Sequence, residues 1–256
     1  MLKIQKSTNI PNFPSLRGTI DSIKFPCFLE PKIDGEAEYY SHTNNHLINK
    51  YGTVRSDFRI TDLLSGVDKD LFCELYVNNG KNGDLYELLK HKHSEPHLKL
   101  MILDVVMPGD SVERKEWILE NIAPVRDILM INQTRLCINR DEILKHTQDL
   151  MNEGYEGVVL KNMDSRFTPN TCSWVKIKNK DRNNYAVSHI DPTLDRIEVL
   201  VQTPGVNMIV GLKATGKQKQ GIQTGDMVEV EHQGILPSGS LRHPVLIGKV
   251  QNQGGI

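Results

Sequence analysis

A lysine, several carboxylates and a later pair of lysines are the residues of this chain that could do chemistry together. The first group is Glu30-Pro31-Lys32-Ile33-Asp34-Gly35. Lysine is normally protonated near pH 7, and it becomes a nucleophile where desolvation or nearby positive charge lowers its pKa. Gly35 permits close backbone approach, and Asp34 can accept a hydrogen bond from a hydroxyl. The group predicts a catalytic lysine at a sharp corner, although Lys-x-Asp-Gly alone is also typical of a surface turn.

Two further carboxylates occur in apolar segments. Glu74 lies in Phe72-Cys73-Glu74-Leu75, and Glu156 opens the run Glu156-Gly157-Val158-Val159-Leu160-Lys161. A lone carboxylate on an apolar strand is costly unless it binds a hydroxyl, a cation or a lysine, and a strand end at the surface is the alternative. We expect Glu156 to bind Mg²⁺, which takes one or two carboxylates together with phosphate oxygens and water. Glu74 is better suited to a ribose hydroxyl.

The segment Trp174-Val175-Lys176-Ile177-Lys178 places two lysines two residues apart. On a strand, both side chains would point to the same face, where their charges repel. An anion such as a phosphate between Lys176 and Lys178 would remove that penalty. The alternative is a solvent-facing edge strand that uses lysine to prevent aggregation.

Strands and helices must position these residues. Strand-like runs occur at 36–41, 71–77, 98–106, 134–139, 157–161 and 174–178. A helix is predicted from about Asp141 to Glu153 with Gly154 as its C-terminal cap, and another begins near Ser111 and is broken at Pro124. Residues 1–26 read as an extended lead-in segment, and we expect no separate N-terminal module.

After Asn183 the pattern changes to five short strand-like runs separated by turn residues. They lie at 185–190, 196–201, 206–212, 227–232 and 245–250. Five short strands suit a small Greek-key barrel of the OB type. The predicted fold is α+β, with a mixed α/β domain at residues 1–183 and a C-terminal OB-fold β-barrel at residues 184–256.

Composition sets limits on the function. The 256 residues suffice for a full core, and four scattered cysteines predict neither a disulfide framework nor a zinc site. No signal core or membrane span is evident, so we expect a soluble cytoplasmic protein without membrane partners. The net charge of −1 means that any nucleic-acid binding must be local, for example through the basic residues 176–182 and 213–219.

In their order, these segments together with Met101-Ile102-Leu103-Asp104 resemble the motifs of ATP-dependent polynucleotide ligases and mRNA capping enzymes. The tail Ser238-Gly239-Ser240-Leu241-Arg242-His243-Pro244 is similar to the last motif of short bacteriophage ATP-dependent DNA ligases. The resemblance covers nearly the whole chain and implies a nucleotidyltransferase domain of the ATP-grasp-like type. It implies a monomeric enzyme that seals nicks in duplex DNA with ATP and Mg²⁺ during replication or repair, in the host-cell cytoplasm.

The resemblance also implies roles for individual residues. Lys32 would take AMP from ATP as a phosphoramide, and Asp34 belongs to the same motif. Glu30 with nearby backbone would contact adenine, while Glu74 would hold the ribose. Glu156 would bind the metal and position the lysine.

The resemblance also implies which basic residues bind the phosphates of ATP. Lys176 and Lys178 would grip the phosphates, and Arg242 would swing in with the C-terminal domain to orient pyrophosphate. Lys50, in Asn49-Lys50-Tyr51-Gly52, stands where the family has an arginine in a similar loop.

Three further positions depart from the family pattern. Ala37 replaces an arginine that normally follows the lysine, and Arg55 or Arg59 could compensate. Leu103 stands where an aromatic residue often stacks on adenine, and Cys73 replaces a common glycine.

Two other patterns resemble functional motifs but lack residues that those motifs require. Residues 211–218 nearly match a phosphate-binding loop, but Gln218 stands where Ser or Thr must bind Mg²⁺, and we expect a basic loop at 212–220 with no helix after the motif. His91, His93 and His97 lack cysteine or carboxylate company, so a solvated helix end is favoured over a metal site.

The alternatives differ in substrate or in class. An RNA ligase or a capping guanylyltransferase would share the lysine chemistry, and labelled ATP or GTP would separate them. A non-catalytic nick-binding or single-strand-binding protein is the other alternative. Few aromatic residues are available for base stacking in the C-terminal strands, with Tyr185 the clearest, which disfavours a single-strand binder.

Overall fold

The computed structural model describes most of the chain as two compact units, Met1–Ile177 and Lys178–Ile256. The described residues are 20–55, 59–77, 85, 88–89, 97–167, 174–178, 180–203, 206–236 and 238–250. Most of the predicted lead-in at 1–26 therefore lies outside the described residues, as do His91, His93 and Cys172. The boundary at 177 precedes β11 (Asp181–Ile190), whereas the predicted boundary at 183 falls inside this strand.

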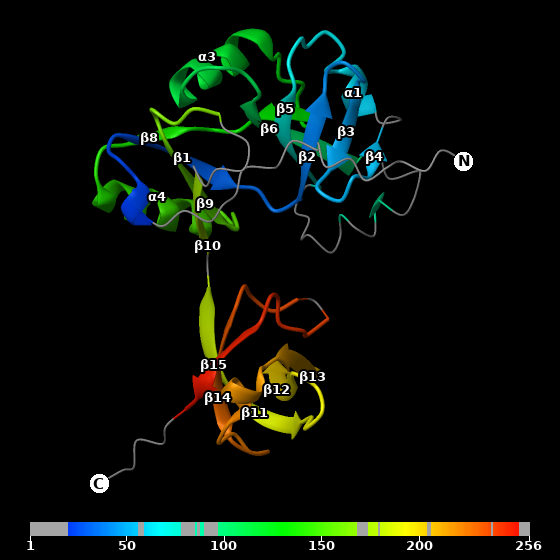
Figure 1. Cartoon of the computed structure of the whole chain (residues 1–256), viewed down its shortest axis with the longest axis vertical. Helices are drawn as coiled ribbons and strands as arrows, with labels where there is room; N and C mark the ends of the chain where they lie inside the picture. Colours follow the sequence, from blue (N-terminus) through cyan, green and yellow to red (C-terminus); the bar gives the residue numbers. More distant parts are fainter. Residues whose placement is uncertain are drawn as a thin grey trace. The chain divides into compact units, whose positions relative to one another are not determined.

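A six-stranded sheet forms one half of the first unit (Figure 1). Its order is β4 (Val54–Arg55), β3 (His46–Asn49), β2 (Glu36–Ser41), β5 (Leu71–Val77), β6 (Leu98–Val105) and β7 (Leu129–Ile131). All neighbours are antiparallel except β6 and β7, which are parallel. The strands predicted at 36–41 and 71–77 have the observed bounds, whereas the shorter β3, β4 and β7 were not predicted.

Two helices accompany this sheet. The helix α3 (Ser111–Asn121) packs Ile118 into the sheet's hydrophobic core, and a short helix α1 (Arg59–Asp62) adds Ile60 to the same core. A capping box begins α3, because Asp110 accepts hydrogen bonds from backbone N–H groups and the Glu113 carboxylate accepts one from the Asp110 N–H. The predicted start near Ser111 is confirmed.

A four-stranded sheet forms the other half of the unit. Its order is β10 (Trp174–Lys178), β9 (Gly157–Asn162), β1 (Cys27–Lys32) and β8 (Arg135–Cys137), and the turn η1 (Ile20–Ser22) precedes β1. The strand β1 pairs antiparallel with both β8 and β9. The helix α4 (Arg140–Asn152) covers one face with Ile143 and Leu150. Asn139 caps its start and Gly154, at φ +95°, follows its end, so the predicted helix at 141–153 is displaced by one residue.

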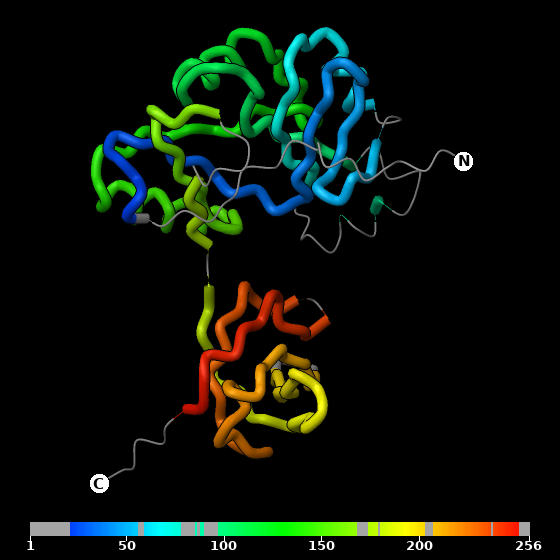
Figure 2. The backbone as a smooth tube through the Cα atoms, in the orientation of Figure 1, coloured from blue at the N-terminus to red at the C-terminus, as the bar shows by residue number. Residues whose placement is uncertain are grey.

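The second unit is a five-stranded antiparallel sheet, traced from yellow to red in Figure 2. Its order is β13 (Val206–Lys213), β12 (Arg196–Thr203), β11, β14 (Met227–His232) and β15 (Val245–Lys249). Its core comprises mainly valine and leucine side chains from these strands. All five predicted strands are present. No pairing between the edge strands β13 and β15 is described, so the predicted closed barrel is not shown.

Candidate active site

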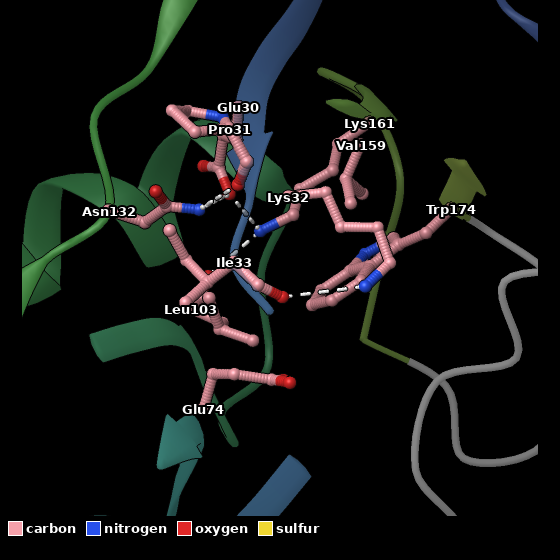
Figure 3. Close-up of a pocket in the computed structure, with 10 residues that line it drawn as sticks. All are labelled: Glu30, Pro31, Lys32, Ile33, Glu74, Leu103, Asn132, Val159, Lys161 and Trp174. Atoms are coloured by element: carbon pink, nitrogen blue, oxygen red, sulfur yellow. Dashed lines mark hydrogen bonds and ion pairs between the residues drawn. The ribbon is translucent and has the colours of Figure 1, made fainter. Parts of the chain in front are cut away.

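A cavity lies between the two sheets of the first unit and is lined by residues of both (Figure 3). Together with the open solvent at its mouth, the cavity encloses about 360 Å³. The lining residues are Glu30, Pro31, Lys32, Ile33, Glu74, Leu103, Asn132, Val159, Lys161 and Trp174. Three of the predicted site residues, Glu30, Lys32 and Glu74, therefore meet in one cavity.

Lys32 reaches this cavity because side chains alternate along β1. Cys27 and Leu29 point into the core beside α4, whereas Glu30 and Lys32 belong to the opposite face and line the cavity. The Lys32 Nζ forms an ion pair with the Glu156 carboxylate and lies 3.4 Å from the Ile33 carbonyl oxygen. The two charged side chains are 15% and 7% exposed, so water screens their attraction only weakly.

Strand register explains why Glu156 lies beside Lys32. Lys32 pairs with Gly157 in the antiparallel ladder of β1 and β9, and Glu156 is the residue immediately before that strand. We expected Glu156 on an apolar strand, and it instead occupies the bend that precedes β9. The bend lets the carboxylate meet the amine at the end of the ladder.

Glu74 approaches the site from the other sheet, where it lies on β5 as predicted. The pKa of Glu74 is raised to about 7, mainly by burial and also by the Glu156 and Asp34 carboxylates. The positive charge of Lys32 and a hydrogen bond from the Gly35 backbone oppose this shift. Near neutral pH, Glu74 therefore exists both as a hydrogen-bond-donating acid and as an accepting carboxylate.

The backbone at Gly35 lies close to that of Leu75 on β5, as the close approach predicted for this glycine requires. A Cβ added at Gly35 would lie 2.2 Å from the Leu75 carbonyl oxygen and 2.9 Å from the Glu74 Cγ. No side chain fits there without moving β5. Because residue 35 has no side chain, the backbone after Lys32 can approach β5 closely. This close approach brings Lys32 and Glu74 to the same cavity.

Glu30 is the centre of a buried polar network that the sequence did not indicate. Its side chain is 2% exposed and lies 2.9 Å from the Lys161 Nζ. Thr134 donates a hydrogen bond to it at 2.8 Å, and Lys115 and Asn132 lie within 3.3 Å. These partners satisfy the buried carboxylate and fix it against the cavity wall.

Lys161 joins several strands around the cavity. Besides pairing with Glu30, its Nζ donates a hydrogen bond to the Leu103 carbonyl oxygen at 2.8 Å and lies 4.0 Å from the centre of the Trp174 ring. The Asp104 carboxylate, held by the buried Arg114, is 4.0 Å away. The sequence contained one indication of this buried lysine, because Lys161 ends an otherwise apolar run after Glu156. On a strand, Lys161 lies on the same face as Val159 and so faces the same cavity.

The arginine that could replace the missing contact at Ala37 is engaged elsewhere. Arg55 forms ion pairs with Glu36 and Glu38 inside the six-stranded sheet. Neither Arg55 nor Arg59 is among the residues that line the cavity. Lys50 is exposed in the turn after β3, where its Nζ lies 4.9 Å from the centre of the Tyr51 ring.

Cys73 and Leu103, the two other residues that differ from the family pattern, lie in different surroundings. Cys73 is buried in the hydrophobic core of the six-stranded sheet, and burial raises the pKa of its thiol well above the usual range. Leu103 lines the cavity as expected for a wall residue. The cavity thus presents an aliphatic side chain where the resemblance suggested an aromatic one.

Lys176 and Lys178 lie on either side of the division between the two units along the chain, and Arg242 lies within the second unit. Lys176 follows Trp174 by two residues on β10 and so belongs to the same strand face. Lys178 begins the second unit, where it donates a hydrogen bond to the Gln233 Oε1 at 3.4 Å. Arg242 also belongs to the second unit, and its carbonyl oxygen accepts a hydrogen bond from the Gln233 N–H at 2.8 Å. The relation of Lys178 and Arg242 to Lys32 stays a prediction.

The expectation of a helix-free loop at 212–220 is wrong. A one-turn helix α5 (Gly216–Lys219) follows Thr215. Gln218 causes this local structure, because its side-chain oxygen accepts a hydrogen bond from the Thr215 N–H at 3.0 Å. Within the described part of the chain, no group of three or more histidine, cysteine or acidic residues is arranged to hold a metal ion, and no helix is long and apolar enough to cross a membrane.

Comparison with known families agrees with this geometry. The model of the ATP dependent DNA ligase domain family matches residues 12–178, which is more than half of the chain. The chain therefore belongs to the family of ATP-dependent DNA ligase domains. It is a ligase enzyme for which ATP and DNA are partners, and the RNA ligase, capping and non-catalytic alternatives are not favoured.

Solved structures with a similar fold are also DNA ligases. A Lig E DNA ligase, whose study describes DNA binding with a minimal scaffold, has a TM-score of 0.75 and 15% identity, over 93% of this chain and 98% of that chain. Chlorella virus DNA ligase-adenylate has a TM-score of 0.53 and 18% identity, over 95% and 99%. A mycobacterial DNA ligase D complexed with ATP and MES has a TM-score of 0.54 and 14% identity, over 95% of both chains. At these identities the likeness shows a shared fold.

Proposed function

We propose that this ligase seals nicks in duplex DNA through an AMP group carried on Lys32. The observation that carries the proposal is the side chain of Lys32, which lines the cavity between the two sheets together with Glu30 and Glu74 and forms an ion pair with Glu156. In the first step the Lys32 nitrogen attacks the α-phosphorus of ATP. An N–P bond forms, the bond to the pyrophosphate oxygen breaks, and pyrophosphate leaves with the electron pair. The Lys32 ammonium gives one proton to the Glu156 carboxylate before the attack, and the nitrogen loses a second proton, through Glu156 to water, as the N–P bond forms.

Carboxylates of the cavity would hold the nucleoside. Glu74 would bind the ribose, since its carboxyl group can donate or accept a hydrogen bond near neutral pH. Glu30 with the neighbouring backbone would contact the base from the fixed position that Lys161 and Thr134 give it. Asp34 would accept a hydrogen bond from a hydroxyl at the corner before β2.

Mg²⁺ fits the donor groups present. Carboxylate oxygens are the ligands that this hard cation prefers, and it commonly uses only one or two together with phosphate oxygens and water. Glu156 would hold it, and Glu74 lies close enough to Glu156 for the two charges to interact. The cation would supply charge neutralisation at the phosphates.

Basic residues would bind the phosphates of ATP. Lys176 and Lys178 would grip the triphosphate, Lys50 would contribute a single point charge, and Arg242 would orient the pyrophosphate. We further propose that the second unit is an OB fold, which its five-stranded antiparallel sheet supports. The DNA substrate would be clasped by the two units of a monomer, in the cytoplasm of a host cell.

Two DNA steps would complete the reaction. The 5′-phosphate at the nick attacks the phosphorus of lysyl-AMP, so that the N–P bond breaks and an adenylylated DNA end forms. The adjacent 3′-hydroxyl then attacks the 5′-phosphate and releases AMP as a phosphodiester bond closes. Positioning and charge neutralisation supply most of the acceleration in such transfers.

Mass spectrometry tests the first step. After incubation with ATP and Mg²⁺, the protein should gain the mass of one AMP at Lys32, whereas incubation with GTP should add nothing. Lys32→Ala should lose both the adduct and nick sealing while it keeps the circular dichroism spectrum of the native protein. Lys24→Ala is the matched control, because that side chain is 70% exposed and pairs with Asp164. An AMP adduct elsewhere, or sealing by Lys32→Ala, would refute the proposal.

A further inference from the structure

A short hairpin of the second unit carries Arg242, the residue proposed to orient the pyrophosphate. It follows β14, and backbone hydrogen bonds join its two arms. The Gln233 N–H donates to the Arg242 carbonyl oxygen at 2.8 Å, and the Arg242 N–H donates to the Gly234 carbonyl oxygen at 3.0 Å. Ile235 and Leu241 form the next bridge along the hairpin. The backbone of Arg242 is therefore held by Gln233 and Gly234.

His232, the last residue of β14, lies at the base of this hairpin. It is 2% exposed, and its Nδ1 accepts a hydrogen bond from the Gly234 N–H at 3.1 Å. A backbone N–H can only donate, so in the neutral ring this bond assigns the proton to Nε2. The Nε2–H faces the Asn183 Oδ1 at 2.9 Å and the Tyr185 hydroxyl oxygen at 3.0 Å, both on β11. Partners on both nitrogens hold the ring in one orientation.

Gly234 needs this partner because the regular strand has ended. Its φ of +95° turns the chain away from β14, and a backbone N–H that leaves a ladder requires another acceptor when it is not fully exposed. The ring of His232 supplies that acceptor. The Lys178 side chain, also proposed for the phosphates, reaches the same hairpin through the Gln233 Oε1 at 3.4 Å. Both proposed phosphate-binding residues of this unit thus depend on how the base of the hairpin is held.

We infer that His232 is a positioning residue for the departure of pyrophosphate, because through the Gly234 N–H it fixes the backbone from which Arg242 extends. The inference rests on the proposed function, which gives Arg242 its role. Pyrophosphate leaves only when lysyl-AMP forms. A residue that acts through Arg242 therefore serves that step and not the later closure of an adenylylated nick.

Rates of the two separate steps give the first test. His232→Leu should slow lysyl-AMP formation at saturating ATP by roughly 10-fold to 100-fold, the effect of a displaced charged group on a transfer reaction. Sealing of a nick that already carries 5′-AMP should keep nearly its wild-type rate. Equal slowing of both steps would reveal a merely structural role and overturn the inference. Normal lysyl-AMP formation in His232→Leu would overturn it as well.

Two polar variants of similar size keep the test sharp even where His232→Leu folds poorly. An asparagine places its Oδ1 near the position of the ring Nδ1, whereas a glutamine places its amide near the position of Nε2. His232→Asn can therefore accept the Gly234 N–H and should recover much of the rate of lysyl-AMP formation. His232→Gln should recover less. Equal rates in these two variants would contradict a role through Gly234.

Coupling to Arg242 gives an independent test. In Arg242→Ala the guanidinium is gone, so His232→Leu should add little further slowing of lysyl-AMP formation. Multiplication of the two separate effects in the double variant would show that His232 acts by another route. His189→Leu, at an exposed histidine on β11, is the matched control and should leave both steps unchanged.

Failure of this inference can be told from failure of the proposed function. The AMP adduct on Lys32 of the wild-type protein is measured in the same preparations. A wild-type adduct whose formation depends on Arg242, together with no separation of the steps in His232→Leu, removes only the positioning role. An adduct that forms equally fast in Arg242→Ala removes the role of Arg242 and the inference with it. Absence of the adduct in the wild-type protein removes the proposed function itself.

Discussion

At the residue scale, the site depends on how closely two backbones approach. Gly35 lies so near Leu75 that a methyl group would overlap its carbonyl oxygen. Gly35→Ala should therefore push β5 and Glu74 away from Lys32. We expect a loss of about 1–3 kcal/mol in the free energy of unfolding and a marked fall in the rate of lysyl-AMP formation. Urea unfolding and the AMP mass gain measure the two effects.

A matched glycine provides the control. Nothing lies within 4 Å of a Cβ added at Gly66, so Gly66→Ala should leave both measurements nearly unchanged. Equal behaviour of the two variants would show that the close contact at Gly35 has no bearing on the site.

At the scale of elements, a buried ion cluster joins β2 to β4. Arg55 reaches across β3 to Glu36 and Glu38, and the Glu38 side chain is fully buried with one carboxylate oxygen lacking a hydrogen-bond partner. Burial raises the pKa of Glu38 from 4.5 to about 8, with Glu36 adding to the shift and Arg55 opposing it. Near neutral pH the folded state therefore favours the protonated carboxyl of Glu38 more than the unfolded chain does.

This shift predicts the sign of a pH dependence. Between pH 4.5 and about 8 the folded state holds a proton that the unfolded chain has released. The contribution of Glu38 to the free energy of unfolding thus falls as pH rises through this window, by at most about 1.4 kcal/mol per pH unit. Glu38→Gln removes the titrating group and should flatten the profile of stability against pH, measured by urea unfolding.

An exposed glutamate on α3 serves for comparison. Glu116→Gln should follow the wild-type profile across the same pH window. A Glu38→Gln profile as steep as that of the wild-type protein would mean that another group controls the dependence.

At the scale of the whole molecule, a net charge of −1 must be reconciled with binding to a polyanion. DNA binding by local basic groups releases counterions, so affinity falls as salt rises. We predict that the affinity for a nicked duplex decreases at least about tenfold between 50 and 200 mM NaCl. Fluorescence anisotropy of a labelled nicked duplex across a salt series measures the slope. A flat series would rule out phosphate contacts as the main source of affinity.

The fold was largely predictable because its elements follow local rules. Strand-like runs identified β2 and β5 with their observed ends, and Gly154 marked the end of α4, which begins one residue before its predicted start. The short strands β3, β4 and β7 were missed because two to four residues carry too little pattern to identify a strand. The turn of helix at Gly216 was missed because it depends on one side-chain contact from Gln218.

The sequence by itself predicted the reactive residues of this protein, because Lys32, Glu74 and Glu156 occur in the order that the resemblance to ATP-dependent ligases requires. Only the tertiary structure decided what surrounds them. Glu30 meets Lys161 because β1 and β9 pair in a particular register, and Trp174 reaches the cavity from β10 beside them. The physical reason is that strand periodicity is a local property, whereas partners of a buried charge are chosen by pairing between segments far apart in the chain.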